Sequence, residues 1–171
     1  MLQITMQVRH DSVYLRGKNC LFYEIKLKNS NNQLSSKMVF KKVVSSSLEI
    51  ELQRISAGYG WTPNVVAVDG LNVVMDSVDG LSLYDKYGDS PSDIPEWIWS
   101  EIFRILTILY ECEGIEYVDI TPFNFIEAEG KIWIIDFGHA YYTKKKGGEK
   151  ADNWFLREFL DGEKGWNPDF A

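Results

Sequence analysis

The stretch from Tyr117 to His139 most constrains what this chain can fold into. It places three oxygen-bearing side chains, Asp119, Asn124 and Asp136, within one short hairpin. An isoleucine-rich apolar run of strand length separates the last two and leads directly into Asp136. The pattern predicts a buried strand that delivers a carboxylate at its end.

Each of the three side chains suits a chemical task. A strand that presents Asp136 just before a glycine can aim its carboxylate at a hard cation. Asn124 would supply a neutral oxygen to the same cation. Asp119, held by a different loop, would orient a hydroxyl nucleophile and accept its proton. We therefore expect Asn124 and Asp136 to be metal ligands and Asp119 to be a catalytic base.

The segments DITPFN and IIDFG resemble the catalytic loop, D-x-x-x-x-N, and the metal-binding D-F-G of the protein-kinase fold. The resemblance implies an α+β, bilobal, kinase-like fold made as a single domain over residues 1–171. Its amino-terminal lobe, residues 1–78, would hold an antiparallel sheet plus one helix. Its carboxyl-terminal lobe, residues 79–171, would be truncated and mostly helical.

Composition narrows the function. The chain of 171 residues has 25 acidic and 18 basic side chains, a net charge of −7, which argues against direct nucleic-acid binding and against a membrane-surface protein. No apolar run approaches membrane-spanning length. Cys20 and Cys112 lack metal-ligand spacing, and no signal peptide is recognisable. We expect a cytoplasmic protein with reduced, buried thiols.

Alternating and apolar segments predict the strands of the amino-terminal lobe, over residues 2–8, 12–15, 21–28 and 38–44. A polar linker is expected over residues 29–36. A helix follows, opened by a capping box of Ser46 and Glu49 and ended by Gly58 and Gly60. A further strand over residues 72–78 is expected to lead into the second lobe.

By the same resemblance, MVFK is similar to the V-A-I-K strand of kinases. Lys41 would then contact the nucleotide phosphates, and Lys42, on the opposite face of the strand, would be the solvated alternative. The helix glutamate that fixes this lysine is expected to be Glu51. The short distance from Lys41 leaves Glu49 open as its partner instead.

The nucleotide site is expected to use residues of the amino-terminal lobe. Gly17 and Lys18 occupy the place of the glycine-rich loop over the phosphates, yet the turn has one glycine where that motif needs several. The turn either contacts phosphate loosely, with Lys18 as a charge, or merely joins two strands. The resemblance places Met75 behind the adenine, with backbone groups of Asp76 and Val78 facing it.

The carboxyl-terminal lobe is expected to contain two main helices. The first starts near Asp93, has Pro95 in its first turn and ends at Gly114, with apolar residues over much of its surface. The second is capped by Asp152 and ends at Gly162. A polar, glycine-containing segment separates D-F-G from the second helix.

The catalytic loop departs from H-R-D, because Tyr117 and Val118 precede Asp119, so control by loop phosphorylation is not expected. Thr121 is similar to the serine or threonine of the RIO kinases and of the small kinase subunit of the KEOPS complex. DITPFNFI and EKADNWFLREFL resemble segments of the latter. The resemblance implies an atypical serine/threonine protein kinase that uses ATP and Mg²⁺, with a protein substrate or a regulatory protein partner.

Two other functions remain open at this point. A pseudokinase or nucleotide-binding module would fit the single-glycine turn, the absent H-R-D and the small second lobe. A small-molecule phosphotransferase shares D-x-x-x-x-N and a metal-binding aspartate. Likeness of fold does not decide among them.

Overall fold

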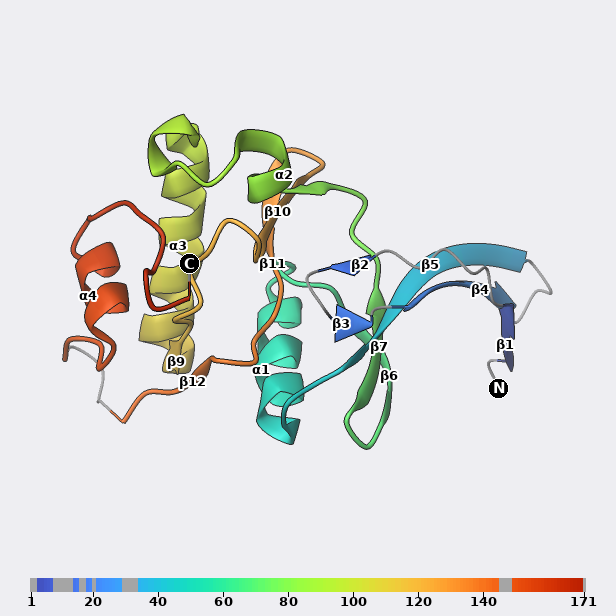
Figure 1. Cartoon of the computed structure of the whole chain (residues 1–171). Helices are drawn as coiled ribbons and strands as arrows, with labels where there is room; N and C mark the ends of the chain where they lie inside the picture. The colour runs from blue at the N-terminus through green and yellow to red at the C-terminus, as the bar shows by residue number, and fades with distance from the viewer. Residues whose placement is uncertain are drawn as a thin grey trace.

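The structure is a computed structural model that describes residues 3–7, 14–15, 18–19, 21–28, 34–144 and 149–170, with side chains from residue 37 onward. Figure 1 shows a sheet-rich half that carries the N-terminus and a helix-rich half that contains α3 and α4. The helices span Ser47–Gly58 (α1), Leu83–Tyr87 (α2), Glu96–Glu113 (α3) and Trp154–Leu160 (α4), with a 3-10 turn over Pro91–Asp93 (η1). The strands span Gln3–Gln7 (β1), Tyr14–Leu15 (β2), Lys18–Asn19 (β3), Leu21–Lys28 (β4), Leu34–Val43 (β5), Val65–Asp69 (β6), Asn72–Asp76 (β7), Leu81–Ser82 (β8), Ile115–Glu116 (β9), Phe125–Ala128 (β10), Lys131–Ile134 (β11) and Tyr141–Tyr142 (β12).

Five antiparallel strands form the sheet of the amino-terminal half, in the order β1-β4-β5-β7-β6. The strands expected over residues 2–8, 21–28 and 38–44 correspond to β1, β4 and β5. Strand β5 begins at Leu34, inside the stretch expected to be a linker, because its ladder with β4 extends to the pair Lys28 and Leu34. The mixed α+β architecture is the one expected from the sequence.

Helix α1 joins the two halves of the molecule, and Figure 1 shows it between the large sheet and the helix-rich half. Ser46 is its N-cap, as expected, and accepts a hydrogen bond from the Glu49 backbone N–H at 3.3 Å. Ile50 packs in a small core with sheet residues, whereas Leu52 belongs to the larger core of the other half. The helix therefore buries its apolar side chains against both halves.

The carboxyl-terminal half is built around α3 and the small sheet β11-β10-β8. The fully buried side chains of α3, each at most 1% exposed, are Ile98, Ile102, Ile105, Leu106 and Leu109. Gly114 follows α3 in the left-handed conformation (φ 65°), which favours glycine at a helix end. The start differs from the expectation, because Pro95 is the N-cap of α3 and Asp93 lies in the separate turn η1.

The last helix also starts differently from the prediction. Asn153, not Asp152, is the N-cap of α4, and its side-chain oxygen accepts a hydrogen bond from the Leu156 N–H at 2.9 Å. The buried carboxylate of Glu116 holds the chain just before the helix, because it accepts hydrogen bonds from the N–H groups of Asp152 (2.8 Å) and Asn153 (2.9 Å). Tyr141 donates a third hydrogen bond to Glu116 at 3.1 Å.

Buried polar contacts connect the segment after α1 to β11. The Gln53 side chain donates to Thr62 Oγ1 at 3.1 Å, and Thr62 Oγ1 donates to the carbonyl of Ile134 at 2.6 Å. The Ile134 N–H donates in turn to the Trp61 carbonyl at 2.7 Å. Gln53, Thr62 and Trp61 are each at most 8% exposed.

The crossing between the halves is tight at Gly80. A Cβ atom added there would lie 2.6 Å from the Glu127 carbonyl oxygen, so only glycine fits against β10.

Cys112 is exposed, so the expectation of a buried thiol is wrong at this position. Among the described residues, no helix has both the length and the apolar character that crossing a membrane requires.

Candidate active site

Asp136 lies two residues beyond β11 and has a left-handed backbone with φ 61°. Residues other than glycine rarely adopt this conformation unless their surroundings impose it. Here Asp136 Oδ1 accepts a hydrogen bond from the Gly138 N–H at 3.2 Å and forms an ion pair with Lys42 Nζ at 2.9 Å. An added Cβ on Gly138 would lie 3.1 Å from the same oxygen. The carboxylate is thus held at the end of the strand, where the sequence predicted it.

The lysine that reaches Asp136 is Lys42, and the expectation that Lys41 would occupy this place is wrong. Lys42 Nζ donates to Glu49 Oε1 at 2.6 Å and to Asp136 Oδ1 at 2.9 Å. Lys42 and Glu49 are both buried. The expected pair of Lys41 and Glu51 is not formed, and the choice left open between the two glutamates falls to Glu49.

The register of β5 explains why Lys42 points inward. Adjacent side chains in a strand point to opposite faces of the sheet. Lys42 pairs with Val73 of β7, which is 1% exposed, whereas Lys41 pairs with the half-buried Val74. The face of β5 that carries Lys42 is therefore the one turned toward the interior.

The orientation of α1 determines which of its glutamates faces the interior and Lys42. Glu49, Gln53 and Ser56 are buried and lie at helical spacing on one face of the helix. Glu51 lies off this face and is exposed; it accepts a hydrogen bond from the Tyr142 hydroxyl at 2.7 Å. Glu51 therefore contacts the segment after D-F-G and not the lysine.

Glu49 is held from two sides. While Oε1 accepts from Lys42, Oε2 accepts hydrogen bonds from the Ser45 N–H at 2.9 Å and the Ser45 hydroxyl at 3.0 Å. Burial alone lowers the pKa of Lys42, but the charge of Asp136 and the hydrogen bond to Glu49 raise it by more, so the net pKa is raised. Lys42 is therefore a fixed ammonium group at neutral pH.

The catalytic loop is tied to the same place through Asn124. The Asn124 side-chain N–H donates to the backbone carbonyl of Asp119 at 3.1 Å, and the Asn124 backbone carbonyl accepts from the Ile135 N–H at 2.9 Å. Ile135 immediately precedes Asp136. One residue thus connects the loop of Asp119 to the chain that carries Asp136.

Tyr117, two residues before Asp119, has a pKa that responds to the nearby carboxylates. Its hydroxyl donates to the Ile135 carbonyl at 2.7 Å, and its side chain is buried. Burial raises the pKa of Tyr117 well above its usual value, and the negative charges of Asp119 and Asp136 raise it further. The charges of both carboxylates therefore act on one buried side chain.

The oxygen set fits a magnesium ion. Because Asn124 uses its side-chain N–H to hold the loop, its side-chain oxygen is the atom left to meet a cation. Mg²⁺ is commonly bound by one or two protein oxygens together with water and substrate phosphates. In the part of the chain that the structure describes, no group of three or more His, Cys, Asp or Glu side chains could hold a metal ion. The donors present suit magnesium shared with phosphate rather than an all-protein cage.

The structure places the other predicted nucleotide contacts only in part. Met75 is 3% exposed in β7, and the Asp76 N–H donates to the Asn64 carbonyl at 3.0 Å. Val78 follows that strand and is half-buried. Gly17 lies outside the described residues, and Lys18 is described only as backbone in β3. The contacts of these residues with a nucleotide stay predictions.

The segment Gly165–Phe170 reaches the catalytic loop, which nothing in its sequence pattern predicted. Asn167, fully buried, donates from its side chain to the Val118 carbonyl at 2.7 Å and from its backbone to the Ile120 carbonyl at 2.8 Å. Trp166 packs with Trp99 and Phe125. The segment therefore supports the loop on both sides of Asp119.

His139 is a further residue at the site that was not singled out from the sequence. Its Nδ1 lies 3.0 Å from Asp119 Oδ2, and its ring contacts the Phe170 ring at a centroid distance of 4.9 Å. Its position directly after D-F-G was the available signal, because a residue that follows Gly138 must lie near Asp136.

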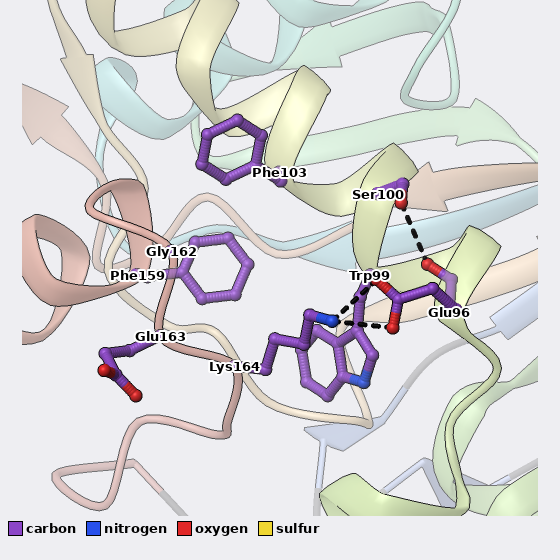
Figure 2. Close-up of a pocket in the computed structure, with 8 residues that line it drawn as sticks. All are labelled: Glu96, Trp99, Ser100, Phe103, Phe159, Gly162, Glu163 and Lys164. Carbon is purple, nitrogen blue, oxygen red and sulfur yellow. Dashed lines mark hydrogen bonds and ion pairs between the residues drawn. The ribbon is translucent and has the colours of Figure 1, made fainter.

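A cavity of about 300 Å³ lies elsewhere, between α3 and the end of α4. Figure 2 shows Trp99, Phe103 and Phe159 facing it, with the Lys164 ammonium bridging to Glu96 across its rim. None of the catalytic candidates lines this cavity. The cavity is therefore separate from the candidate active site.

Comparison with known proteins agrees with this geometry. The family model described as the RIO domain matches residues 9–157. The chain is also 30% identical over 101 residues to the KEOPS complex subunit Bud32 of Pyrococcus abyssi (strain GE5 / Orsay), a match that covers 58% of this chain and 46% of that protein. The match thus spans less than half the length of the curated relative.

Proposed function

Because the chain belongs to the RIO domain family of atypical kinase-like proteins, we propose that it is an ATP-dependent phosphotransferase. The proposed activity is that of an atypical serine/threonine protein kinase, which transfers the terminal phosphoryl group of ATP to a hydroxyl group. The observation that carries the proposal is the placement of Lys42, which contacts Glu49 and Asp136 at once. In kinases, this lysine–glutamate pair and the metal-binding aspartate must both be in place for activity.

Each residue has a role in the proposed reaction. Lys42, oriented by Glu49, holds phosphate oxygens of ATP as a positive charge. Asp136 and Asn124 would hold Mg²⁺, which when bound neutralises charge on the phosphates. Asp119 orients the acceptor hydroxyl and accepts its proton. As the new oxygen–phosphorus bond forms, the bond between the terminal phosphorus and its bridging oxygen breaks, and ADP leaves with the electron pair.

Placement and charge are the main requirements of such a reaction, since the phosphoryl group in transfer needs little covalent assistance. The site offers both. Lys42 and Glu49 are buried and mutually fixed, and Asp136 is anchored through Lys42 and Gly138. Adenine would lie against Met75 and the backbone around Asp76 and Val78.

We also propose that the chain acts with a protein partner. The support is that one relative is, by its name, a subunit of the KEOPS complex. The partner is either a substrate that supplies the hydroxyl or a protein that regulates the site. Cytoplasmic location is part of the same proposal.

The test is a magnesium-dependent ATP turnover assay with self-transfer and a generic protein acceptor. The wild-type protein is expected to turn over ATP only when magnesium is present, and chelation should abolish the reaction. Asp136→Asn should lower turnover by about 1000-fold, because it removes the charge that would hold the metal. Asp69→Asn, at the exposed end of β6, is the matched control and should leave turnover unchanged.

Three results would redirect the proposal. Nucleotide binding without turnover would support a pseudokinase or nucleotide-binding module. Transfer to a small molecule but to no protein would support a small-molecule phosphotransferase. Undiminished turnover by the Asp136→Asn protein would contradict the assigned site.

A further inference from the structure

We infer that His139 is a positioning residue for Asp119, held in place by Phe170. This inference rests on the proposed function, since it assigns the residue that orients the base of that reaction. His139 directly follows the D-F-G segment, whereas Phe170 lies near the end of the chain. Two segments distant in sequence therefore meet at one oxygen of the catalytic loop.

The contact with Asp119 is specific in its atoms. His139 Nδ1 lies 3.0 Å from Asp119 Oδ2, and an ionised carboxylate only accepts hydrogen bonds, so Nδ1 is the donor. The other oxygen, Oδ1, has a longer contact of 3.4 Å with the Thr121 hydroxyl. With Oδ2 held by the ring, the carboxylate can rotate little, and Oδ1 is the oxygen turned to an incoming hydroxyl.

The ring itself needs support, because the His139 side chain is 59% exposed while that of Asp119 is 14% exposed. An exposed imidazole would exchange among rotamers unless a neighbour restrained it. Phe170 provides that restraint, with its ring centroid 4.9 Å from the His139 ring at an interplanar angle of 45°.

Phe170 is in turn fixed by its own segment. Its N–H donates to the Asn167 carbonyl at 3.1 Å, and Asn167 is fully buried. The Asn167 side-chain oxygen accepts from the Asp169 N–H at 3.1 Å, and Asp169 accepts from the Trp154 indole N–H at 3.1 Å. Since Asn167 also binds the backbone beside Asp119, the loop, the imidazole and the phenyl ring are held by one set of contacts.

In the proposed reaction, Asp119 takes the proton of the acceptor hydroxyl as the phosphoryl group is transferred. His139 donates its hydrogen bond to the carboxylate before and during this step and exchanges no proton. Its effect is on the geometry of the base. The loss of His139 is therefore expected to lower kcat and to leave the KM for ATP unchanged, because Asp119 and Phe170, which the ring contacts, are not among the residues proposed to hold ATP.

The experiment compares four variants in the magnesium-dependent turnover assay. His139→Ala should lower kcat about tenfold, a fraction of what a whole general base contributes. His139→Asn should recover most of the rate, because its side-chain N–H lies near the position of Nδ1. Phe170→Ala should lower kcat about threefold. Asp69→Asn, at the exposed end of β6, is the control and should leave kcat unchanged.

Magnetic resonance of the histidine rings tests the contact independently of turnover. The ring signals of His139 should shift in Asp119→Asn and in Phe170→Ala proteins and stay unchanged in Asp69→Asn. Absent turnover in the wild type, with these shifts present, would refute the proposed reaction and retain the contact. An active wild type with unaltered kcat in His139→Ala, a higher kcat in that variant, or no rescue by asparagine would overturn the inference.

Discussion

Strand β5 and helix α1 each carry two residues of one type, lysine in β5 and glutamate in α1, and the structure places the two members of each pair in different surroundings. On the inner face, Lys42 and Glu49 are buried, paired with each other and joined to Asp136. Off that face, Lys41 is only half-buried, and Glu51 is exposed and binds Tyr142 instead. Residue type does not distinguish the pairs. The difference comes from strand register and helix rotation, which decide whether a charge meets a fixed partner or water.

The largest expected contrast is between the two lysines. Lys42→Met should lower magnesium-dependent turnover by about 100-fold, since it removes a charge placed in advance for the phosphates. Lys41→Met should change turnover by no more than about twofold. Steady-state kinetics of both variants gives the comparison, with circular dichroism to show that each is folded. A greater loss in the Lys41 variant would reverse the assignment of the two faces.

The glutamates should repeat the contrast on a smaller scale. Glu49→Gln keeps the shape of the side chain but removes the charge that orients Lys42, and turnover should fall roughly tenfold. Glu51→Gln serves as its matched partner and should stay within about twofold of the wild type. Equal effects of the two substitutions would show that the buried carboxylate has no special role.

Alkaline pH should weaken the contribution of Lys42 to the stability of the fold. The folded pKa of Lys42 is raised above 10.5, chiefly because Asp136 and Glu49 outweigh its burial. Its contribution to the free energy of unfolding is therefore complete below the unfolded pKa and is lost as pH rises through the folded pKa. The stability difference between wild type and Lys42→Met should shrink as pH rises beyond 10.5, measured by urea unfolding. A stability difference that stays constant over this pH range would contradict the prediction.

The smallest effect belongs to the outer contact. Tyr142→Phe removes the hydroxyl that donates to Glu51 at 2.7 Å, and both groups are exposed. The loss should cost about 0.5 kcal/mol or less of unfolding free energy. Urea titration at neutral pH measures it. A cost above about 2 kcal/mol would mean that the outer pair stabilises the fold as strongly as a buried one.

Much of the site was predictable because it is local in sequence. Asp119, Asn124 and Asp136 fall within one hairpin, and in the structure Asn124 is hydrogen-bonded to the backbone of Asp119 and to that of Ile135, the residue before Asp136. The Ser46 cap and the end of α3 at Gly114 were predictable for the same reason. These features depend on a few neighbouring residues and their backbone preferences.

The choice between Lys41 and Lys42 was not predictable, because it depends on how β5 pairs with strands distant in the sequence. A shift of one residue exchanges the two faces, and two adjacent lysines give no pattern to resolve it. The place of Asn167 and Phe170 against the catalytic loop was hidden for a related reason. Their partners lie in a separate segment, and a short stretch without periodicity does not indicate which segment it packs against.

The buried link from Gln53 through Thr62 to Ile134 restricts how this molecule can open and close. A motion that moved α1 away from β11 would break these buried hydrogen bonds, and leaving buried polar groups without partners costs free energy. The helix that carries Glu49, the partner of Lys42, is therefore expected to move together with the carboxyl-terminal half. Any opening of the proposed nucleotide site would then come from movement of the sheet on the other side of that helix.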